Sequence, residues 1–162
     1  KPWALPGNFK VWNIFNQDFQ EFLLALNEKK VNYVLVGGYS VIYHGFPRTT
    51  GDLDLFVEVS KDNYDKLVQA FNRFQMPTFD MTEDSFLNQS EINVYTFGRP
   101  PICIEILKEI AGFSFQQIHE NAIQTVFEGI PMKIIHLNDL RTNKKISGRS
   151  KDLNDLENLS EL

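Results

Sequence analysis

The order of hydrophobic and polar positions predicts alternating helices and short strands along most of the chain. Apolar side chains recur every three or four residues within 12–30 and again within 63–74, which is the period of an amphipathic helix. The first of these helices presents one apolar face: Phe15, Phe19, Phe22, Leu23 and Leu26. Shorter helices are predicted at four further places: residues 39–44, 115–122, 138–146 and 150–159.

Short runs rich in β-branched and aromatic residues predict six strands: residues 33–36, 53–57, 92–97, 102–107, 125–128 and 132–135. The last two flank Gly129-Ile130-Pro131 and predict a hairpin. Residues 76–89 are acidic and turn-rich and predict a mobile loop, whereas residues 1–10, rich in proline and glycine, predict an N-terminal arm. Together these elements predict an α/β fold (α+β in a stricter classification) with a mixed, largely antiparallel twisted sheet and flanking helices.

Composition places the chain among ordinary globular domains. It has 162 residues, of which 43% are hydrophobic and 23% charged. This length predicts a single domain over 1–162, closed by C-terminal helices over 138–162. The absence of a long apolar run argues against a membrane-spanning helix, and the single cysteine, Cys103, excludes a disulfide scaffold. Since the N-terminal segment lacks a signal-peptide pattern, we expect a cytoplasmic protein.

The segment around Gly37 and Gly38 carries the first candidate chemistry. The two glycines follow an apolar strand and precede a predicted helix. Glycine permits a tight turn and close approach of the backbone to a phosphate, because it has no Cβ. The amide groups at the start of the following helix would point to the same place, and the Ser40 hydroxyl would add a ligand for a phosphate oxygen. These residues predict a phosphate cradle.

Asp52 and Asp54 lie two residues apart on the next predicted strand, so both side chains leave by the same face. Adjacent carboxylates repel each other unless a cation lies between them. Hard oxygen ligands beside a phosphate cradle suit Mg²⁺, which shares its coordination sphere with substrate phosphates. Two such ions would clamp the attacking and leaving oxygens of a phosphoryl displacement, so two Mg²⁺ ions are expected.

Taken together, Gly37, Gly38, Asp52 and Asp54 resemble the signature of the polymerase-β-like nucleotidyltransferase superfamily. The stretches 35–45 and 47–54 are similar to its small bacterial branch, which includes antibiotic-modifying nucleotidyltransferases and antitoxin-type nucleotidyltransferase-like domains. The likeness extends from about residue 32 to residue 159. It implies the nucleotidyltransferase fold, a nucleoside triphosphate (NTP) as substrate, and metal binding by Asp52 and Asp54.

The resemblance also implies a third metal-binding carboxylate on a later strand, and Glu105 is the candidate. Glu105 lies within the apolar run Ile102-Cys103-Ile104-Glu105-Ile106-Leu107. A carboxylate there is costly unless it is paired or metal-bound. In the family this group helps to deprotonate the acceptor hydroxyl and is more often Asp. The alternative is that Glu105 is a solvated residue, which would leave a nucleotide-binding site with little chemistry.

Basic residues supply further candidates for phosphate binding. Arg48 lies in the loop before the two aspartates, and Lys144 and Lys151 lie in the C-terminal stretch 143–156, which also resembles an element of this branch. A mobile ammonium is a useful phosphate partner. The alternative for this stretch is that its charged residues join the two terminal helices through ion pairs: Arg149, Lys151, Asp152 and Asp155.

The leading expectation is a Mg²⁺-dependent enzyme that transfers a nucleoside monophosphate from an NTP to a hydroxyl of a small molecule, protein or RNA, with release of pyrophosphate. One alternative is a nucleotide-binding, antitoxin-type protein with little catalysis that acts through a toxin-like partner. Another is a tRNA or RNA nucleotidyltransferase, against which the net charge of −5 argues. A homodimer stays open, because the face formed by Trp12, Phe15, Phe19 and Phe22 is either core or a dimer seam.

Overall fold

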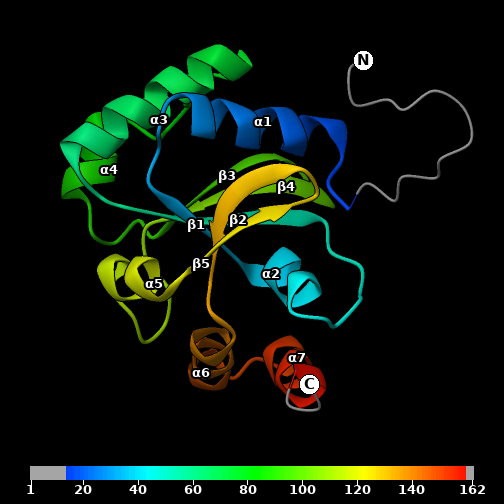
Figure 1. The fold of residues 1–162 in the computed structure, drawn as a ribbon. Coiled ribbons are helices and arrows are strands. Elements are labelled where there is room, and N and C mark those ends of the chain that lie inside the picture. Colours follow the sequence, from blue (N-terminus) through cyan, green and yellow to red (C-terminus); the bar gives the residue numbers. More distant parts are fainter. Residues whose placement is uncertain (1–13, 160–162) are drawn as a thin grey trace, which may run out of the picture.

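A computed structural model describes residues 14–159 of the chain as a six-stranded mixed sheet with helices on both faces (Figure 1). The strands are β1 Tyr33–Val36, β2 Asp52–Val57, β3 Val94–Arg99, β4 Ile102–Leu107, β5 Ile123–Phe127 and β6 Ile130–Ile134. The helices are α1 Gln17–Glu28, α2 Gly37–Tyr43, α3 Lys61–Phe74, α4 Glu83–Asn88, α5 Phe115–Asn121, α6 Leu137–Ser147 and α7 Ser150–Leu159. The mixed α/β class predicted from the sequence is confirmed.

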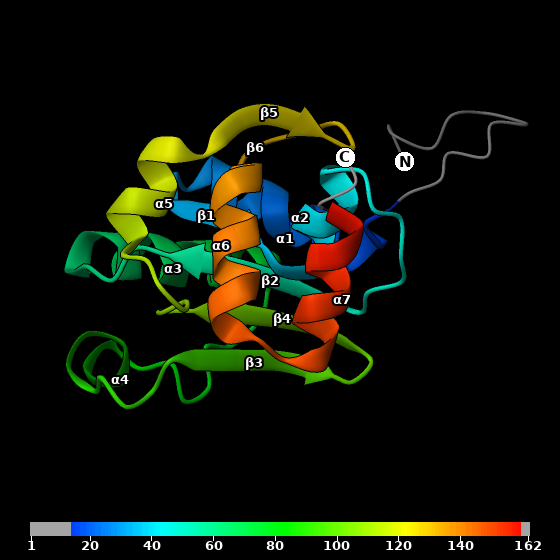
Figure 2. The ribbon, with the colours of Figure 1, turned by 90° about the horizontal axis from the view of Figure 1, so that it is seen from below.

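The strand order is β3-β4-β2-β1-β6-β5, which places the two central strands β2 and β1 side by side and antiparallel. β2 also pairs with β4 and β1 with β6, both in parallel, whereas β3 and β5 are antiparallel edge strands. Helices α1 and α3 cover one face, and α2, α6 and α7 lie on the other (Figures 1 and 2). β1 passes directly into α2 at Val36 and Gly37, and Val36 pairs with Asp54 of β2, so the start of α2 lies beside β2 at the centre of the sheet.

Aromatic side chains fill the core between the sheet and the helices α1 and α3. Phe22 of α1 contacts Phe71 and Phe74 of α3, with ring centroids 5.4 and 5.3 Å apart. Phe71 in turn packs edge-on against Phe97 of β3. Each such pair adds about 0.5–1.5 kcal/mol beyond the burial of its area. The apolar face that begins at Phe15 is buried in this core, whereas Trp12 and the N-terminal arm lie outside the described residues.

Local turn and cap chemistry explains where several predicted elements differ from the structure. The β5–β6 turn consists of Glu128 and Gly129, both at positive φ, so Pro131 lies inside β6 rather than in the turn as predicted. Residues 76–89, predicted to be a mobile loop, contain the helix α4. Its N-cap Thr82 accepts a hydrogen bond from the backbone of Ser85, and Phe86 is buried, which together fix that turn. The first helix begins at Gln17, because the Asn16 side chain caps it.

Helices of the described part, residues 14–159, are all too short or too polar to cross a lipid bilayer.

Candidate functional site

Three carboxylates meet where β2 runs beside β4. The parallel register pairs Asp54 with Glu105 and Asp52 with Cys103, so the side chains of Asp52, Asp54 and Glu105 leave the sheet by the same face. One ligand oxygen from each of the three lies within 4.8 Å of those from the other two. We refer to Asp52, Asp54 and Glu105 as the acidic trio. The sequence predicted all three as site residues, and the fold brings them together.

Within residues 14–159, no cationic side chain forms an ion pair with the acidic trio, and the pKa values of its carboxyl groups reflect this. Burial raises the pKa of Asp54 to about 8, and a hydrogen bond with Glu105 and the charges of Glu105 and Asp52 add to the rise. Burial and the charge of Glu105 also raise the pKa of Asp52. In addition, Oδ1 of Asp54 is buried and has no hydrogen-bond partner. Carboxylate oxygens are the ligands that Mg²⁺ prefers, and the trio offers three close together, with a buried unpartnered oxygen on Asp54, so these residues fit a divalent cation.

Gly37 makes the close approach of α2 to the acidic trio possible. Its φ is +69°, a conformation that favours glycine, and a Cβ at this position would overlap the carboxylate of Asp54. A Cβ on Gly38 would similarly overlap the side chain of Thr50 in the loop before β2. Close packing therefore requires glycine at both positions, which the sequence did not indicate. Their predicted role in holding phosphate stays a prediction.

Ser40 is fully buried in the first turn of α2, where its hydroxyl donates a hydrogen bond of 2.6 Å to the carbonyl oxygen of Gly37. The hydroxyl proton is therefore engaged in closing the turn. For Ser40 to bind a phosphate, as predicted, its hydroxyl would have to give up this hydrogen bond. Otherwise its oxygen could only accept a hydrogen bond from a protonated phosphate oxygen.

Arg48 and Lys144, both predicted to bind phosphate, form ion pairs beneath α7. Arg48 reaches Asp155 through Nε and Nη2, at 2.7 and 2.9 Å. Lys144 Nζ lies 2.9 Å from Asp155 Oδ2 and 3.2 Å from Asp152 Oδ1. Arg149 Nε completes the group at 2.7 Å from Asp152 Oδ2. For Lys144 this geometry favours the alternative in which the charges join the terminal helices. We refer to these five residues as the ion cluster.

Arg149 and Lys151, at the start of α7, face the acidic trio. The charge of Lys151 lowers the pKa of both Asp52 and Asp54, against the larger effect of burial. Hydrogen bonding to Asp152 raises the pKa of Arg149, and the charges of Asp54 and Glu105 contribute to that rise. Lys151 was a predicted phosphate ligand and lies where such a role is feasible. Arg149 was not predicted to bind phosphate; the sequence named it only as a member of the alternative set of ion pairs in the C-terminal stretch.

A family model matches residues 15–162, which is most of the chain, and its description reads "nucleotidyl transferase of unknown function" (DUF2204). The chain belongs to this family. It is thus a nucleotidyltransferase-like domain, in agreement with the resemblance that the glycine pair and the acidic residues carry. No curated protein matches the sequence.

Among solved structures, the chain is similar to the crystal structure of a candidate nucleotidyltransferase from Thermotoga maritima. The two share 15% sequence identity with a TM-score of 0.53, and the match covers 89% of this chain and 91% of that chain. At this identity the similarity concerns the fold alone. The predicted nucleotidyltransferase fold is confirmed.

Proposed function

We propose that the protein is a Mg²⁺-dependent nucleotidyltransferase that moves a nucleoside monophosphate from an NTP to a hydroxyl acceptor. The observation that carries this proposal is the acidic trio, three clustered carboxylates with a buried unpartnered oxygen, next to the turn at Gly37. In such a reaction the acceptor oxygen forms a bond to the α-phosphorus, and the bond from that phosphorus to the bridging oxygen breaks. Pyrophosphate leaves, and the acceptor hydroxyl loses its proton.

Each residue of the site then has a distinct task. Asp52, Asp54 and Glu105 hold Mg²⁺, which when bound neutralises charge on the phosphates. Glu105 lies on β4, opposite Asp54 of β2, and accepts the proton of the acceptor hydroxyl. Arg149 and Lys151 face the trio and bind the phosphate groups of the NTP. Most of the catalysis would come from positioning and electrostatics, as in other phosphoryl transfers.

Arg48 and Lys144 are held by carboxylates of α7 and act as positioning residues in this proposal. Lys144 is only 5% exposed and Arg48 is bound through two nitrogens to Asp155, so neither side chain is free to move onto a phosphate. The ion cluster instead fixes the start of α7, and with it Arg149 and Lys151, relative to the loop that precedes β2. We propose that Arg48 and Lys144 position the phosphate-binding residues.

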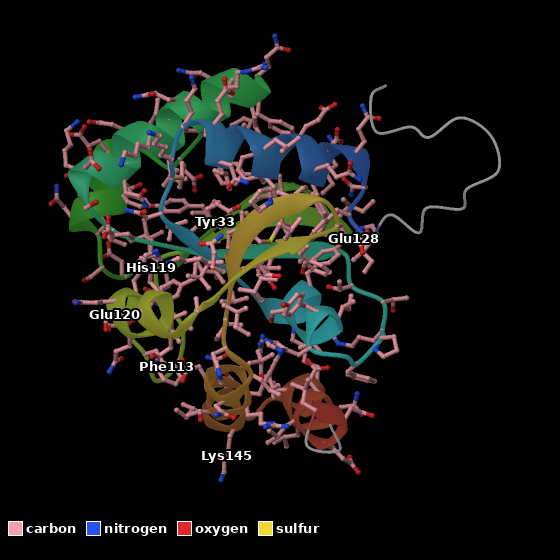
Figure 3. All side chains as sticks on the ribbon, in the orientation of Figure 1. Tyr33, Phe113, His119, Glu120, Glu128 and Lys145 are labelled. Carbon is pink, nitrogen blue, oxygen red and sulfur yellow. The ribbon has the colours of Figure 1, made fainter. Side chains whose placement is uncertain are left out.

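Titration calorimetry with ATP, CTP, GTP and UTP, with and without Mg²⁺, tests the proposal. We expect at least one nucleotide to bind only with Mg²⁺, and the double variant Asp52→Asn/Asp54→Asn to lose that binding. A matched control is Glu128→Gln, which removes an exposed carboxylate at the tip of the β5–β6 turn (Figure 3) and should bind as the wild type does.

Release of pyrophosphate in the presence of hydroxyl acceptors separates the proposal from its two alternatives. Release with a small hydroxylated acceptor supports it, and release with tRNA alone supports the RNA-modifying alternative. Metal-dependent binding without any release favours a nucleotide-binding protein that acts through a partner. If no nucleotide binds to the intact protein, the acidic trio has no role in nucleotide transfer and the proposal is wrong.

A further inference from the structure

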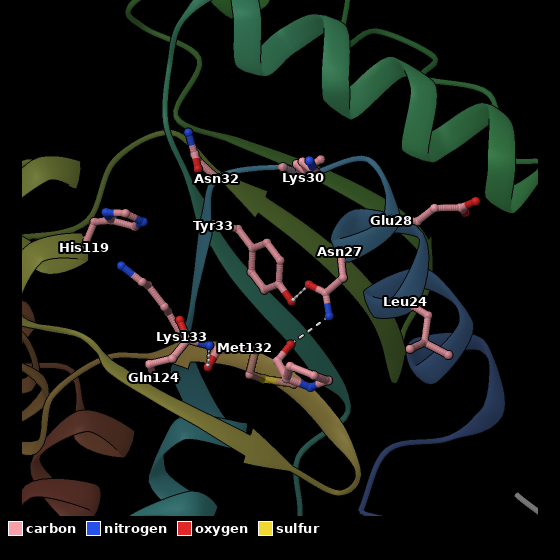
Figure 4. Close-up of a pocket in the computed structure, with 12 residues that line it drawn as sticks. Leu24, Asn27, Glu28, Lys30, Asn32, Tyr33, His119, Gln124, Met132 and Lys133 are labelled. Carbon is pink, nitrogen blue, oxygen red and sulfur yellow. Dashed lines mark hydrogen bonds between the residues drawn. The ribbon is translucent and has the colours of Figure 1, made fainter.

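A cavity lies at the start of β1, beside Tyr33 (Figure 4). It has a volume of about 660 Å³, within the range of small-molecule sites. Tyr33, where β1 begins, lies in its wall, whereas Val36 at the other end of β1 pairs with Asp54. Tyr33 and Val36 are three residue steps apart along the strand, or about 10 Å. None of the acidic trio or the ion cluster lines this cavity.

One side of the cavity is apolar and rigid. The Tyr33 hydroxyl donates to Asn27 Oδ1 at 2.8 Å, and Asn27 Nδ2 donates to the Pro131 carbonyl oxygen at 2.7 Å (Figure 4). These bonds hold the phenol ring and the amide in place and satisfy their polar groups. Leu24, half exposed at the rim, and the buried Met132 extend the apolar surface. The wall offers shape and apolar contact to a flat group rather than hydrogen bonds.

The other side carries positive charge without an acidic partner. Lys30 and Lys133 form no ion pair with any carboxylate of the described residues. Lys133 is half-buried and points toward His119 in Figure 4. Burial and the charge of Lys133 lower the pKa of His119, so its ring is neutral at pH 7 and one nitrogen can donate a hydrogen bond.

Nearby carboxylates are engaged elsewhere. Glu28, the acidic residue among those that line the cavity, points away from Lys133 and pairs with Arg73 at 3.0 Å. Glu58 and Glu120 act on His119 only through smaller effects on its pKa. Glu58 accepts hydrogen bonds from Asn32 and Ser60. In a chain with a net charge of −5, this cavity thus combines an apolar wall with an uncompensated lysine and a histidine.

We propose that this cavity is a second binding site, for a small organic anion with a flat apolar body. The carboxylate or phosphate of the ligand lies between Lys133 and His119, and its apolar body lies against Tyr33, Met132 and Leu24. Because Tyr33 begins the strand that ends at the turn of Gly37, a ligand here contacts an element of the nucleotide site. The proposal does not depend on the function proposed for the acidic trio.

NMR titration of the intact chain in EDTA tests this proposal, since the chelator keeps the acidic trio free of metal. The probes are phenyl phosphate and benzoate, with inorganic phosphate and benzyl alcohol as controls that lack the apolar body or the charge. We expect at least one aromatic anion to shift the His119 ring and Met132 methyl resonances saturably, and each control to bind much more weakly. Binding of phenyl phosphate alone identifies a phosphate ligand, and binding of benzoate alone a carboxylate.

Variants link the binding to the cationic side of the cavity. Lys133→Gln should weaken the binding of the better aromatic anion about tenfold, the loss of one charge-assisted contact, and Lys133→Arg should retain it. Lys145→Gln removes an exposed lysine that projects from α6 away from the cavity (Figure 3), and should have no effect. The absence of saturable shifts at millimolar probe, equal binding of benzyl alcohol, or unchanged affinity in Lys133→Gln would each overturn the proposal.

Discussion

The acidic trio and the ion cluster both remove carboxylates from water, but they treat the charges in opposite ways. In the ion cluster, Asp152 and Asp155 are almost fully buried and each is bound to two cationic side chains. Burial alone would raise the pKa of Asp152, but hydrogen bonds from Arg149 and Lys144 outweigh it and the pKa is lowered. In the acidic trio, three like charges meet and the pKa of Asp54 is raised to about 8.

The difference indicates what each group is for. A buried carboxylate with cationic partners stabilises the arrangement of the elements that carry it, here α6, α7 and the loop of Arg48. A group of like charges destabilises the folded chain in the absence of a cation, and such groups occur where a ligand supplies the missing charge. The trio thus costs stability and is suited to function, whereas the ion cluster is suited to holding the site in place.

Breaking the ion cluster should have the largest effect on stability. In Asp155→Asn, the buried Lys144 loses one of its two carboxylate partners among the described residues, and Arg48 loses the one that it has there. Because breaking a buried ion pair leaves a charge uncompensated, we expect the free energy of unfolding to fall by about 3–5 kcal/mol. Urea denaturation should show the same loss in EDTA and in Mg²⁺. Asp65→Asn, at the exposed pair with Lys61, is the control and should have little effect.

The same change in the acidic trio should have the opposite effect on stability. Asp54→Asn removes one of three like charges, so the metal-free protein should become more stable at pH 8 and lose its stabilisation by Mg²⁺. Pyrophosphate release should fall at least about 100-fold. Loss of a residue that only orients a metal ligand typically lowers activity about 10–100-fold, and loss of the metal ligand itself should lower it more. Denaturation of both proteins with and without Mg²⁺ checks the first effect. A destabilised variant would show that Asp54 has a cationic partner after all.

The sequence could predict those features of the site that depend on residues close together in the chain. Asp52 and Asp54 share a face by strand alternation, and the apolar neighbours of Glu105 marked it as exceptional. The parallel pairing of β2 with β4, which places Glu105 opposite Asp54, was not predicted and comes from the tertiary fold. The β5–β6 turn was misplaced because two positive-φ residues, one of them Glu128, make the turn instead of the Gly-Ile-Pro segment.

Ion pairs between residues that are far apart in the sequence could not be predicted in the same way. Arg48 and Asp155 are 107 positions apart, and nothing near either residue indicates that they pair. An arginine in a loop next to a phosphate cradle was naturally expected to bind phosphate. Likewise, the burial of Lys144 depends on how α6 packs against α7, so only the tertiary structure separates a phosphate ligand from a structural cation.

Titration of Asp54 should make the metal-free protein less stable as pH rises. Its folded pKa, about 8, exceeds the unfolded value of 3.8, so the native state keeps a proton that the unfolded state loses. The contribution is complete below pH 4 and is lost progressively up to about pH 8. Measured in EDTA, the Tm of Asp54→Asn relative to that of the wild type should therefore rise across this interval. A constant difference would contradict the raised pKa.

The smallest expected change in stability concerns Arg149, which belongs to the ion cluster and also faces the acidic trio. Its side chain is 62% exposed, and Asp152 keeps Lys144 as a partner when Arg149 is removed. Arg149→Gln should therefore lower the free energy of unfolding by no more than about 1 kcal/mol. If the side chain binds phosphate, however, affinity for the NTP in Mg²⁺ should fall about tenfold, the effect of one charge-assisted contact.

Calorimetry of Arg149→Gln and Arg149→Lys beside Lys145→Gln separates the two tasks. The lysine variant keeps the charge but not the planar group that reaches Asp152, so it should recover part of the nucleotide affinity. Lys145→Gln, on the exposed side of α6, should bind as the wild type does. Equal affinities in all three variants would assign Arg149 to the ion cluster alone. Lys151 would then be the remaining cation at the start of α7 that can bind the phosphates.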